Sequence, residues 1–329
     1  MNQVEKLRSL RELTVITSAY AVEDRRRSWT AVLTTAALLT VAVASAAAAL
    51  PLPLRITGSV AASLLLIRMF VLYHDFEHGA ILRNSRLARP LLRAFGLLIL
   101  SPPSIWNRLH NYHHSHNCQF VTSGIGSFPV LTRREYVAAS TAARLWYRLL
   151  RSPLMMAAAY VTVFVSGFCL KSVHDDRRRH WDSAVALAIH VALLVVAARA
   201  GWTTLLLAVV GPMWCAHAAG AYLFYAQHNF PGVRLQGREQ WDYVHAAVYA
   251  SSVMEGSRFM HWVTANIGYH NVHHLNSKIP FYRLAEAMAA VPELRESGKT
   301  SLALRDIRAC LALKVWDEHE GRMVGYPAV

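Results

Sequence analysis

Residues 29–50 read WTAVLTTAALLTVAVASAAAAL, a stretch without a single charged side chain. As an α-helix it is long enough to cross the hydrocarbon core of a bilayer, which is about 30 Å thick. Closely spaced prolines end the stretch, and a second apolar run follows at residues 56–73. Two more runs lie at residues 182–199 and 202–225. The sequence therefore predicts an all-α integral membrane protein with four transmembrane helices.

The overall composition agrees with this class. Of the 329 residues, 54% are hydrophobic and only 16% are charged, whereas soluble domains carry about 25% charged residues. The net charge of +14 would suit a nucleic-acid partner. However, the basic residues gather beside apolar runs, as in Arg25–Arg27 and Arg177–Arg179, where anionic lipid head groups account for them. We therefore expect a membrane environment and no nucleic acid. The four scattered cysteines predict neither a disulfide nor a cysteine metal site.

The distribution of basic residues also predicts the orientation of the chain. Arg25–Arg27 precede the first run, so the positive-inside rule assigns the N-terminal segment 1–28 to the cytoplasm. Residues 89–100 are too few to span the bilayer and predict an interfacial or re-entrant helix. We interpret residues 153–170 in the same way, because a further crossing would separate the histidine clusters described next. Both termini are then cytoplasmic.

The whole chain, residues 1–329, is expected to form one membrane domain. Its C-terminal segment, residues 280–329, is polar. We expect this segment to be cytosolic and helical, and to pack against a cytosolic cap that holds the histidines.

Nine histidines fall in three clusters and one single position, each next to the end of an apolar run. Spacings of three and four residues place side chains on one face of a helix. Neutral imidazole suits iron, zinc, copper and nickel, and a zinc hydrolase needs only three protein ligands. Nine imidazoles instead fit two metals with four or five nitrogen ligands each. The nine are His74, His78, His110, His113, His114, His228, His270, His273 and His274.

Iron is the metal that this location favours. A membrane enzyme meets inert hydrocarbon chains, and no side chain can abstract hydrogen from an unactivated C–H bond, whereas a metal–oxygen species can. A non-catalytic metal carrier is the alternative from another class. Carriers place ionisable residues at mid-span, whereas these clusters are predicted at one face of the membrane.

The four stretches resemble the histidine boxes of the membrane fatty-acid desaturase family, and the resemblance covers roughly residues 71–284. The continuation Ser277-Lys-Ile-Pro280-Phe-Tyr-Arg-Leu is similar to the bacterial acyl-lipid branch that includes Δ12-type enzymes. The boxes are His74-Asp-Phe-Glu-His78, His110-Asn-Tyr-His113-His114, Gln227-His228-Asn-Phe and Gly268-Tyr-His270-Asn-Val-His273-His274-Leu-Asn.

This resemblance implies a non-haem di-iron centre with the nine histidines as ligands. It further implies O2 as co-substrate and a fatty acyl lipid as substrate, in a bacterial inner membrane. Electrons would come from a separate ferredoxin or cytochrome-b5-like protein, because the sequence has no His-Pro-Gly-Gly heme motif. Such enzymes introduce a double bond into the acyl chain.

The sequence also departs from parts of the family. Some relatives have an asparagine one turn before the lone histidine, where this chain has Phe224. The first box has three intervening residues, whereas the acyl-CoA branch has four, which favours a lipid-linked substrate. A hydroxylase, epoxygenase or acetylenase of the same superfamily stays open. Alkane hydroxylases are less favoured, because they carry an extra residue in the second box.

Further residues are candidates for supporting roles. Ligating imidazoles need hydrogen-bond acceptors that orient them, and the candidates are Asp75, Glu77, Asn107 and Asn266. An acyl tunnel needs apolar walls near the boxes, and the candidates are Trp106, Trp262, Tyr269 and His217. His217 lies three helical turns before His228, and a satisfied buried histidine is the competing interpretation for it.

Overall fold

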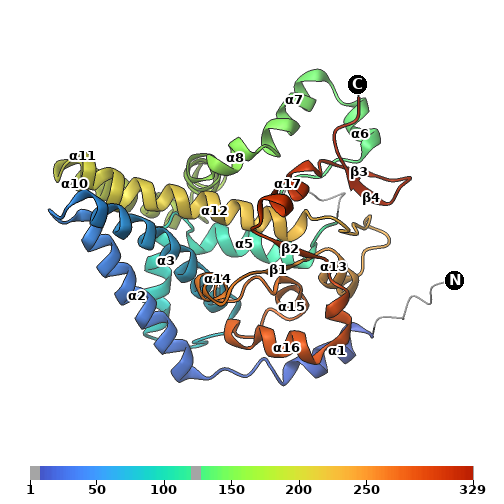
Figure 1. Cartoon of the computed structure of the whole chain (residues 1–329), viewed down its shortest axis with the longest axis horizontal. Helices are drawn as coiled ribbons and strands as arrows, with labels where there is room; N and C mark the ends of the chain where they lie inside the picture. The colour runs from blue at the N-terminus through green and yellow to red at the C-terminus, as the bar shows by residue number, and fades with distance from the viewer. Residues whose placement is uncertain (1–7, 120–126, 329) are drawn as a thin grey trace.

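The computed structural model describes residues 8–119 and 127–328 of the chain. It is predominantly helical, and long helices gather on one side with a cap of short elements on the other (Figure 1). Four helices are long and apolar enough to cross a membrane, which confirms the predicted number. They are α2 (Arg25–Ala47), α3 (Leu52–His78), α10 (Trp181–Arg199) and a helix from Trp202 to His228 made of α11 (Trp202–Thr204), η3 (Leu205–Val210) and α12 (Gly211–His228).

Local sequence signals fix where the first two spans begin, meet and end. Asp24 caps α2 by accepting the backbone N–H groups of Arg26 and Arg27, each at 3.0 Å. Gly58 lets α3 approach α2 closely, since a Cβ there would lie 2.8 Å from the backbone oxygen of Ala42. Gly79 ends α3 in the left-handed conformation, with φ of 68°. The helix therefore stops directly after its last histidine.

Shorter helices connect the spans. Residues 89–100, predicted as interfacial, form α4 (Ala88–Leu98), which packs against α3 and α10. Residues 153–170 form α8 (Pro153–Ala157) and the π-helical η2 (Tyr160–Lys171), which are not among the four candidate spans of the described residues. The other connecting helices are α5 (Pro103–Ser115), α6 (Arg133–Ala138), α7 (Thr141–Leu150) and α9 (Ser172–Asp175), and α1 (Leu10–Ser18) precedes the first span.

The cap follows α12. Its elements are α13 (Tyr243–Tyr249), β1 (Val253–Glu255), α14 (Arg258–Val263), α15 (His270–Leu275), η4 (Phe281–Arg283), α16 (Leu284–Ala290), η5 (Pro292–Glu296), β2 (Lys299–Ser301), α17 (Leu304–Ala312), β3 (Val315–Asp317) and β4 (Arg322–Val324). The strands form two small sheets, in which β1 pairs in parallel with β2 and β3 pairs antiparallel with β4.

The expectation of a helical C-terminal segment was therefore wrong in part. Three of its elements are strands of three residues each. Such strands are too short to reveal the alternation of apolar and polar residues by which a strand is recognised.

The largest hydrophobic core joins the spans to the cap. Leu72 and Tyr73 of α3 belong to the same buried cluster as Ile279, Phe281 and Leu284 of the C-terminal segment. This packing fixes the end of α3 against the loop that follows α15. Because α3 and α15 both carry histidine clusters, the two clusters are held close together.

Candidate metal centre

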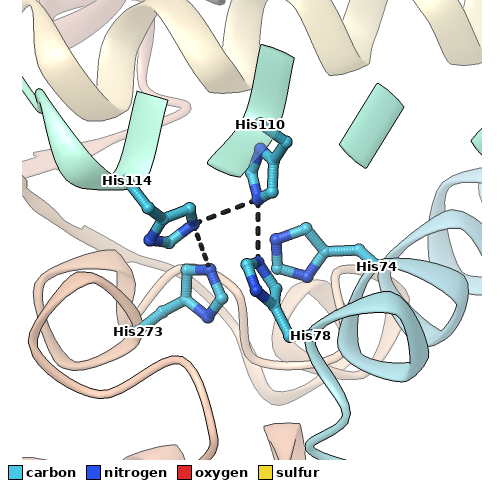
Figure 2. A group of neighbouring side chains, drawn as sticks. All are labelled: His74, His78, His110, His114 and His273. Atoms are coloured by element: carbon cyan, nitrogen blue, oxygen red, sulfur yellow. Dashed lines mark hydrogen bonds between the residues drawn. The ribbon is translucent and has the colours of Figure 1, made fainter. Parts of the chain in front are cut away.

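The structure brings all nine predicted histidines together at the junction of the spans and the cap. The last turns of α3 and α12 supply His74, His78 and His228, while α5 and α15 supply three each. They form two groups, and within each group the ligand atoms lie within 4.8 Å of one another. The first group, drawn in Figure 2, is His74, His78, His110, His114 and His273; the second is His113, His228, His270 and His274.

In the first group, ring nitrogens from three elements face one another. The Nε2 atom of His110 lies 2.9 Å from Nε2 of His78 and 3.0 Å from Nε2 of His114. His114 in turn lies 3.1 Å from Nε2 of His273 (Figure 2). Two imidazole nitrogens bound at right angles to one ion at about 2.1 Å would be about 3.0 Å apart. The observed separations therefore suit a shared metal ion.

In the second group, the four Nε2 atoms form a closed ring. His113 lies 3.1 Å from His228 and 3.2 Å from His274. His270 lies 2.9 Å from His228 and 3.1 Å from His274. Each group thus has its own compact set of nitrogens, five in the first and four in the second.

For His228 and His74, a hydrogen bond on the far side of the ring determines which nitrogen points inward unprotonated. Nδ1 of His228 lies 3.0 Å from the carbonyl oxygen of Ala250. A carbonyl only accepts, so a neutral His228 carries its proton on Nδ1 and presents an Nε2 lone pair to the group. Nδ1 of His74 likewise faces Oδ1 of Asp75 at 3.2 Å. Lone pairs that converge in a buried site repel one another unless a cation lies between them.

Burial keeps six of the nine histidines, those on α5 and α15, in the neutral form that binds metals. It lowers the pKa well below the usual histidine value for the members on α5 and α15, and the neighbouring imidazoles lower it further. These members are His110, His113, His114, His270, His273 and His274. A neutral imidazole binds a metal without first losing a proton.

The predicted supporting residues differ in how they reach the histidines. Asp75 makes direct contact, and its second oxygen accepts the backbone N–H of Phe281 at 2.8 Å. Asn266 contributes through the same loop, because its amide donates to the carbonyl of Phe281 at 3.1 Å. Among the described residues, Glu77 and Asn107 are bonded to each other at 2.6 Å and not to a clustered histidine.

The predicted tunnel residues are also scattered. Trp106 packs edge-on against His110, with ring centroids 3.7 Å apart. Trp262 is exposed beneath Arg68, and Tyr269 stacks on His261. Both ring nitrogens of His217 face backbone carbonyls, at 2.6 and 3.0 Å, which fits a satisfied buried histidine.

None of these four residues lines either of two cavities that lie close to the centre. The larger cavity, about 250 Å³, lies between α12, α14 and β2 and has mostly apolar walls that include Leu223, Met254 and Met260. The smaller, about 40 Å³, reaches His113 and His228 and is bordered by Phe224.

Sequence reasoning missed several contacts of the centre, of which two involve Ala250 and Tyr243. The carbonyl of Ala250 orients His228, and Tyr243 donates its hydroxyl hydrogen to the carbonyl of His274 at 2.5 Å. A backbone carbonyl carries no side-chain signal, so Ala250 could not have been found from the sequence. Tyr243 lies in a polar stretch without a histidine pattern and gave no signal either.

Comparisons with known proteins agree with this architecture. A family model described as fatty acid desaturase matches residues 51–304. The chain is 33% identical to a fatty acid desaturase of Bacillus subtilis (strain 168), over 82% of this chain and 77% of that protein. It is 23% identical to an sn-1 oleoyl-lipid 12-desaturase of Anabaena variabilis, over 82% of this chain and 78% of the relative.

A third relative is an sn-1 acyl-lipid omega-3 desaturase (ferredoxin) of Synechocystis. It is 25% identical, over 68% of this chain and 63% of the relative. The matched region contains all nine histidines, whose convergence is the main feature of the structure. The chain therefore belongs to the fatty acid desaturase family, and it is a membrane-bound oxidoreductase of that family.

Proposed function

We propose that this enzyme introduces a double bond into a fatty acyl chain carried by a membrane lipid. It would do so with two iron ions held by the nine clustered histidines, with O2 as co-substrate. The single observation that carries the proposal is the convergence of these side chains from four helices into two compact nitrogen groups.

The donor set fits iron better than a hard cation. Imidazole nitrogen suits iron, whereas magnesium and calcium take oxygen ligands. The two groups offer five and four nitrogens, so neither needs a ligand from outside the nine to reach four-coordination. Bound irons would supply, with O2, the hydrogen abstraction from C–H that no side chain performs.

The protein's own residues do the positioning. Asp75 and the Ala250 carbonyl fix the rings of His74 and His228 from behind, so their Nε2 atoms stay directed inward. Phe224 lies against His113, with ring centroids 4.9 Å apart, so an apolar ring covers part of the second group. Apolar cover helps to shield a reactive oxidant from solvent.

The lipid-linked substrate and the separate electron donor are supported by the relatives. Two of them are named for acyl-lipid or oleoyl-lipid substrates, and one name includes ferredoxin. We infer that a ferredoxin or cytochrome-b5-like protein delivers two electrons per double bond to this chain.

We assign the centre and both termini to the cytoplasmic side of the membrane, in bacteria the inner membrane. Two arginine triplets, residues 25–27 and 177–179, stand at the N-terminal ends of α2 and α10. Since α3 and α12 run the opposite way and end in histidines, their histidine ends belong to the same basic side.

The test is expression in a host with a simple acyl profile, followed by mapping of double-bond positions in its lipids. We expect a new unsaturated species with the wild-type chain and none with His113→Ala or His273→Ala. The matched control is His319→Ala, because His319 is exposed and outside both groups. Full activity in both cluster variants would refute the ligand assignment.

Metal analysis of the purified protein provides the second arm. About two irons per chain are expected, with a lower content in both cluster variants and no change in the control. A wild-type protein that carries zinc alone would contradict the proposed chemistry. A hydroxylated acyl product in the lipid analysis would instead identify the enzyme as a hydroxylase.

A further inference from the structure

Helix α7 has an apolar stripe that no part of the described chain covers. Ala142, Leu145, Trp146 and Leu149 follow the three- and four-residue spacing of one helix face. Leu145 is 60% exposed and Trp146 59% exposed. Monomeric soluble surfaces rarely carry such a continuous apolar strip. In Figure 1 the α6–α7 segment stands apart from the bundle of long helices.

The opposite side of α7 already has its packing partners. Tyr147 is buried, and its ring lies 5.8 Å from that of Tyr136 and 6.3 Å from that of Tyr326. The Tyr147 hydroxyl donates to the carbonyl of Lys314 at 2.5 Å. The helix is therefore held in place by one face, and the other face carries the exposed stripe.

Basic side chains flank the stripe. Residues 133–150 contain four arginines and one glutamate. Arg133 pairs with Asp317. Arg134, Arg144 and Arg148 have no carboxylate partner within the described parts of the chain. An amphipathic helix with leucine and tryptophan on one face and arginine beside it is typical of helices that lie in the head-group region of a bilayer.

The segment also continues directly into the membrane-embedded part of the protein. Two residues after α7 the chain enters α8, which packs against the membrane-spanning helix α12. On α8, Met156 is buried whereas Leu154 is 69% exposed. The apolar surface of α7 is thus an extension of the lipid-facing surface, not an isolated patch on the cap.

We propose that α7 lies in the interfacial region of the bilayer, with the stripe Ala142, Leu145, Trp146 and Leu149 inserted among the acyl chains and the neighbouring arginines on anionic head groups. A second copy of the chain and an acidic soluble protein are the competing occupants. Neither occupant explains why the apolar surface of α7 continues into α8. A bilayer explains it, because α8 packs against α12, which the bilayer must already surround.

The test uses an environment-sensitive fluorophore (NBD) attached to Leu145→Cys in the full-length protein. Cys215, the one native cysteine that is exposed in the structure, is first changed to alanine. The matched control is Ala143→Cys, two residues earlier and about 160° away around the helix axis. Ala143 is also exposed. Leu154→Cys provides a second reporter if labelling at Leu145 perturbs the helix.

Each labelled protein is reconstituted into vesicles of phosphatidylcholine with or without phosphatidylglycerol. We expect blue-shifted emission from Leu145→Cys and at least threefold stronger quenching by a doxyl-labelled lipid than for Ala143→Cys. Aqueous iodide should show the reverse order. Phosphatidylglycerol should increase lipid quenching, and Arg134→Gln with Arg144→Gln should remove that increase.

Two results would overturn the proposal. Equal iodide quenching at both positions would mean that the stripe faces water. Protection of Leu145→Cys from both quenchers would mean that protein covers it, either a second copy or another chain retained in purification.

Discussion

Replacing Asp75 with asparagine should weaken metal binding, because both carboxylate oxygens are in use. Oδ1 faces Nδ1 of His74 at 3.2 Å and Oδ2 accepts the N–H of Phe281 at 2.8 Å. Asparagine has a single acceptor oxygen, so in either orientation its NH2 group meets one of these two donors. One buried hydrogen bond is lost and replaced by a repulsive contact.

The size of the effect follows from two independent figures. A buried hydrogen bond to a charged group contributes about 1.5–3 kcal/mol. Loss of an acceptor behind a ligating histidine typically costs about 10–100-fold in metal affinity, or about 1.4–2.7 kcal/mol. The two ranges overlap, so we expect Asp75→Asn to weaken metal binding about 10–100-fold.

The measurement is metal content of the purified protein across a series of chelator-buffered free iron or cobalt concentrations. Glu77→Gln is the matched control, since Glu77 is a carboxylate on the same helix whose bonds go to Arg93 and Asn107. Its metal affinity should stay within about threefold of wild type. Wild-type affinity in Asp75→Asn, or an equal loss in Glu77→Gln, would refute the assignment of Asp75 as the orienting acceptor.

Three further predictions concern stability, each measured by thermal unfolding in detergent. Gly58→Leu should lower the unfolding temperature, because the new Cβ would lie 2.8 Å from the Ala42 carbonyl oxygen and push α2 away from α3. The control Gly220→Ala should leave the unfolding temperature unchanged, because the space around Gly220 is open. Removing metal with a chelator should lower the unfolding temperature, and adding iron back should restore it, because a ligand of the native state stabilises it; no change would argue against a bound metal. Burial lowers the pKa of Lys314 from 10.5 to about 8, so the unfolded state binds more protons than the folded state between these two pH values. The wild-type protein should therefore gain stability relative to Lys314→Met as the pH rises through this range. A stability difference that does not change with pH would contradict this prediction.

The four spans could be predicted from sequence because each is a long run whose composition alone decides its environment. The histidines were equally accessible. The spacing of His110, His113 and His114 predicts that they share one helix face, and the same holds for the cluster on α15. Periodicity and chemistry point the same way at these positions, so no tertiary information was needed.

The contacts that support the histidines were harder to predict from the sequence, because they depend on which segments of the chain meet in the fold. Asp75 and Glu77 look alike in the sequence, yet only Asp75 faces a clustered histidine, because the chain after α15 folds back over it at Phe281. Ala250 acts through its backbone carbonyl, so its side chain gives no indication of this role in the sequence. The stripe on α7 lies outside the segments that were predicted from the sequence. Only the structure shows that Tyr147 packs on the opposite face of this helix and leaves the stripe exposed.

The order of the histidines along the chain has a consequence for biosynthesis. The ribosome releases His74 first and His274 two hundred residues later, and each nitrogen group contains members from both halves of that interval. Neither pocket is complete until α12 has been inserted and α15 has emerged. Metal loading of the proposed centre would thereby be a late step, and a chain truncated before residue 270 is expected to reach the membrane without retaining a metal.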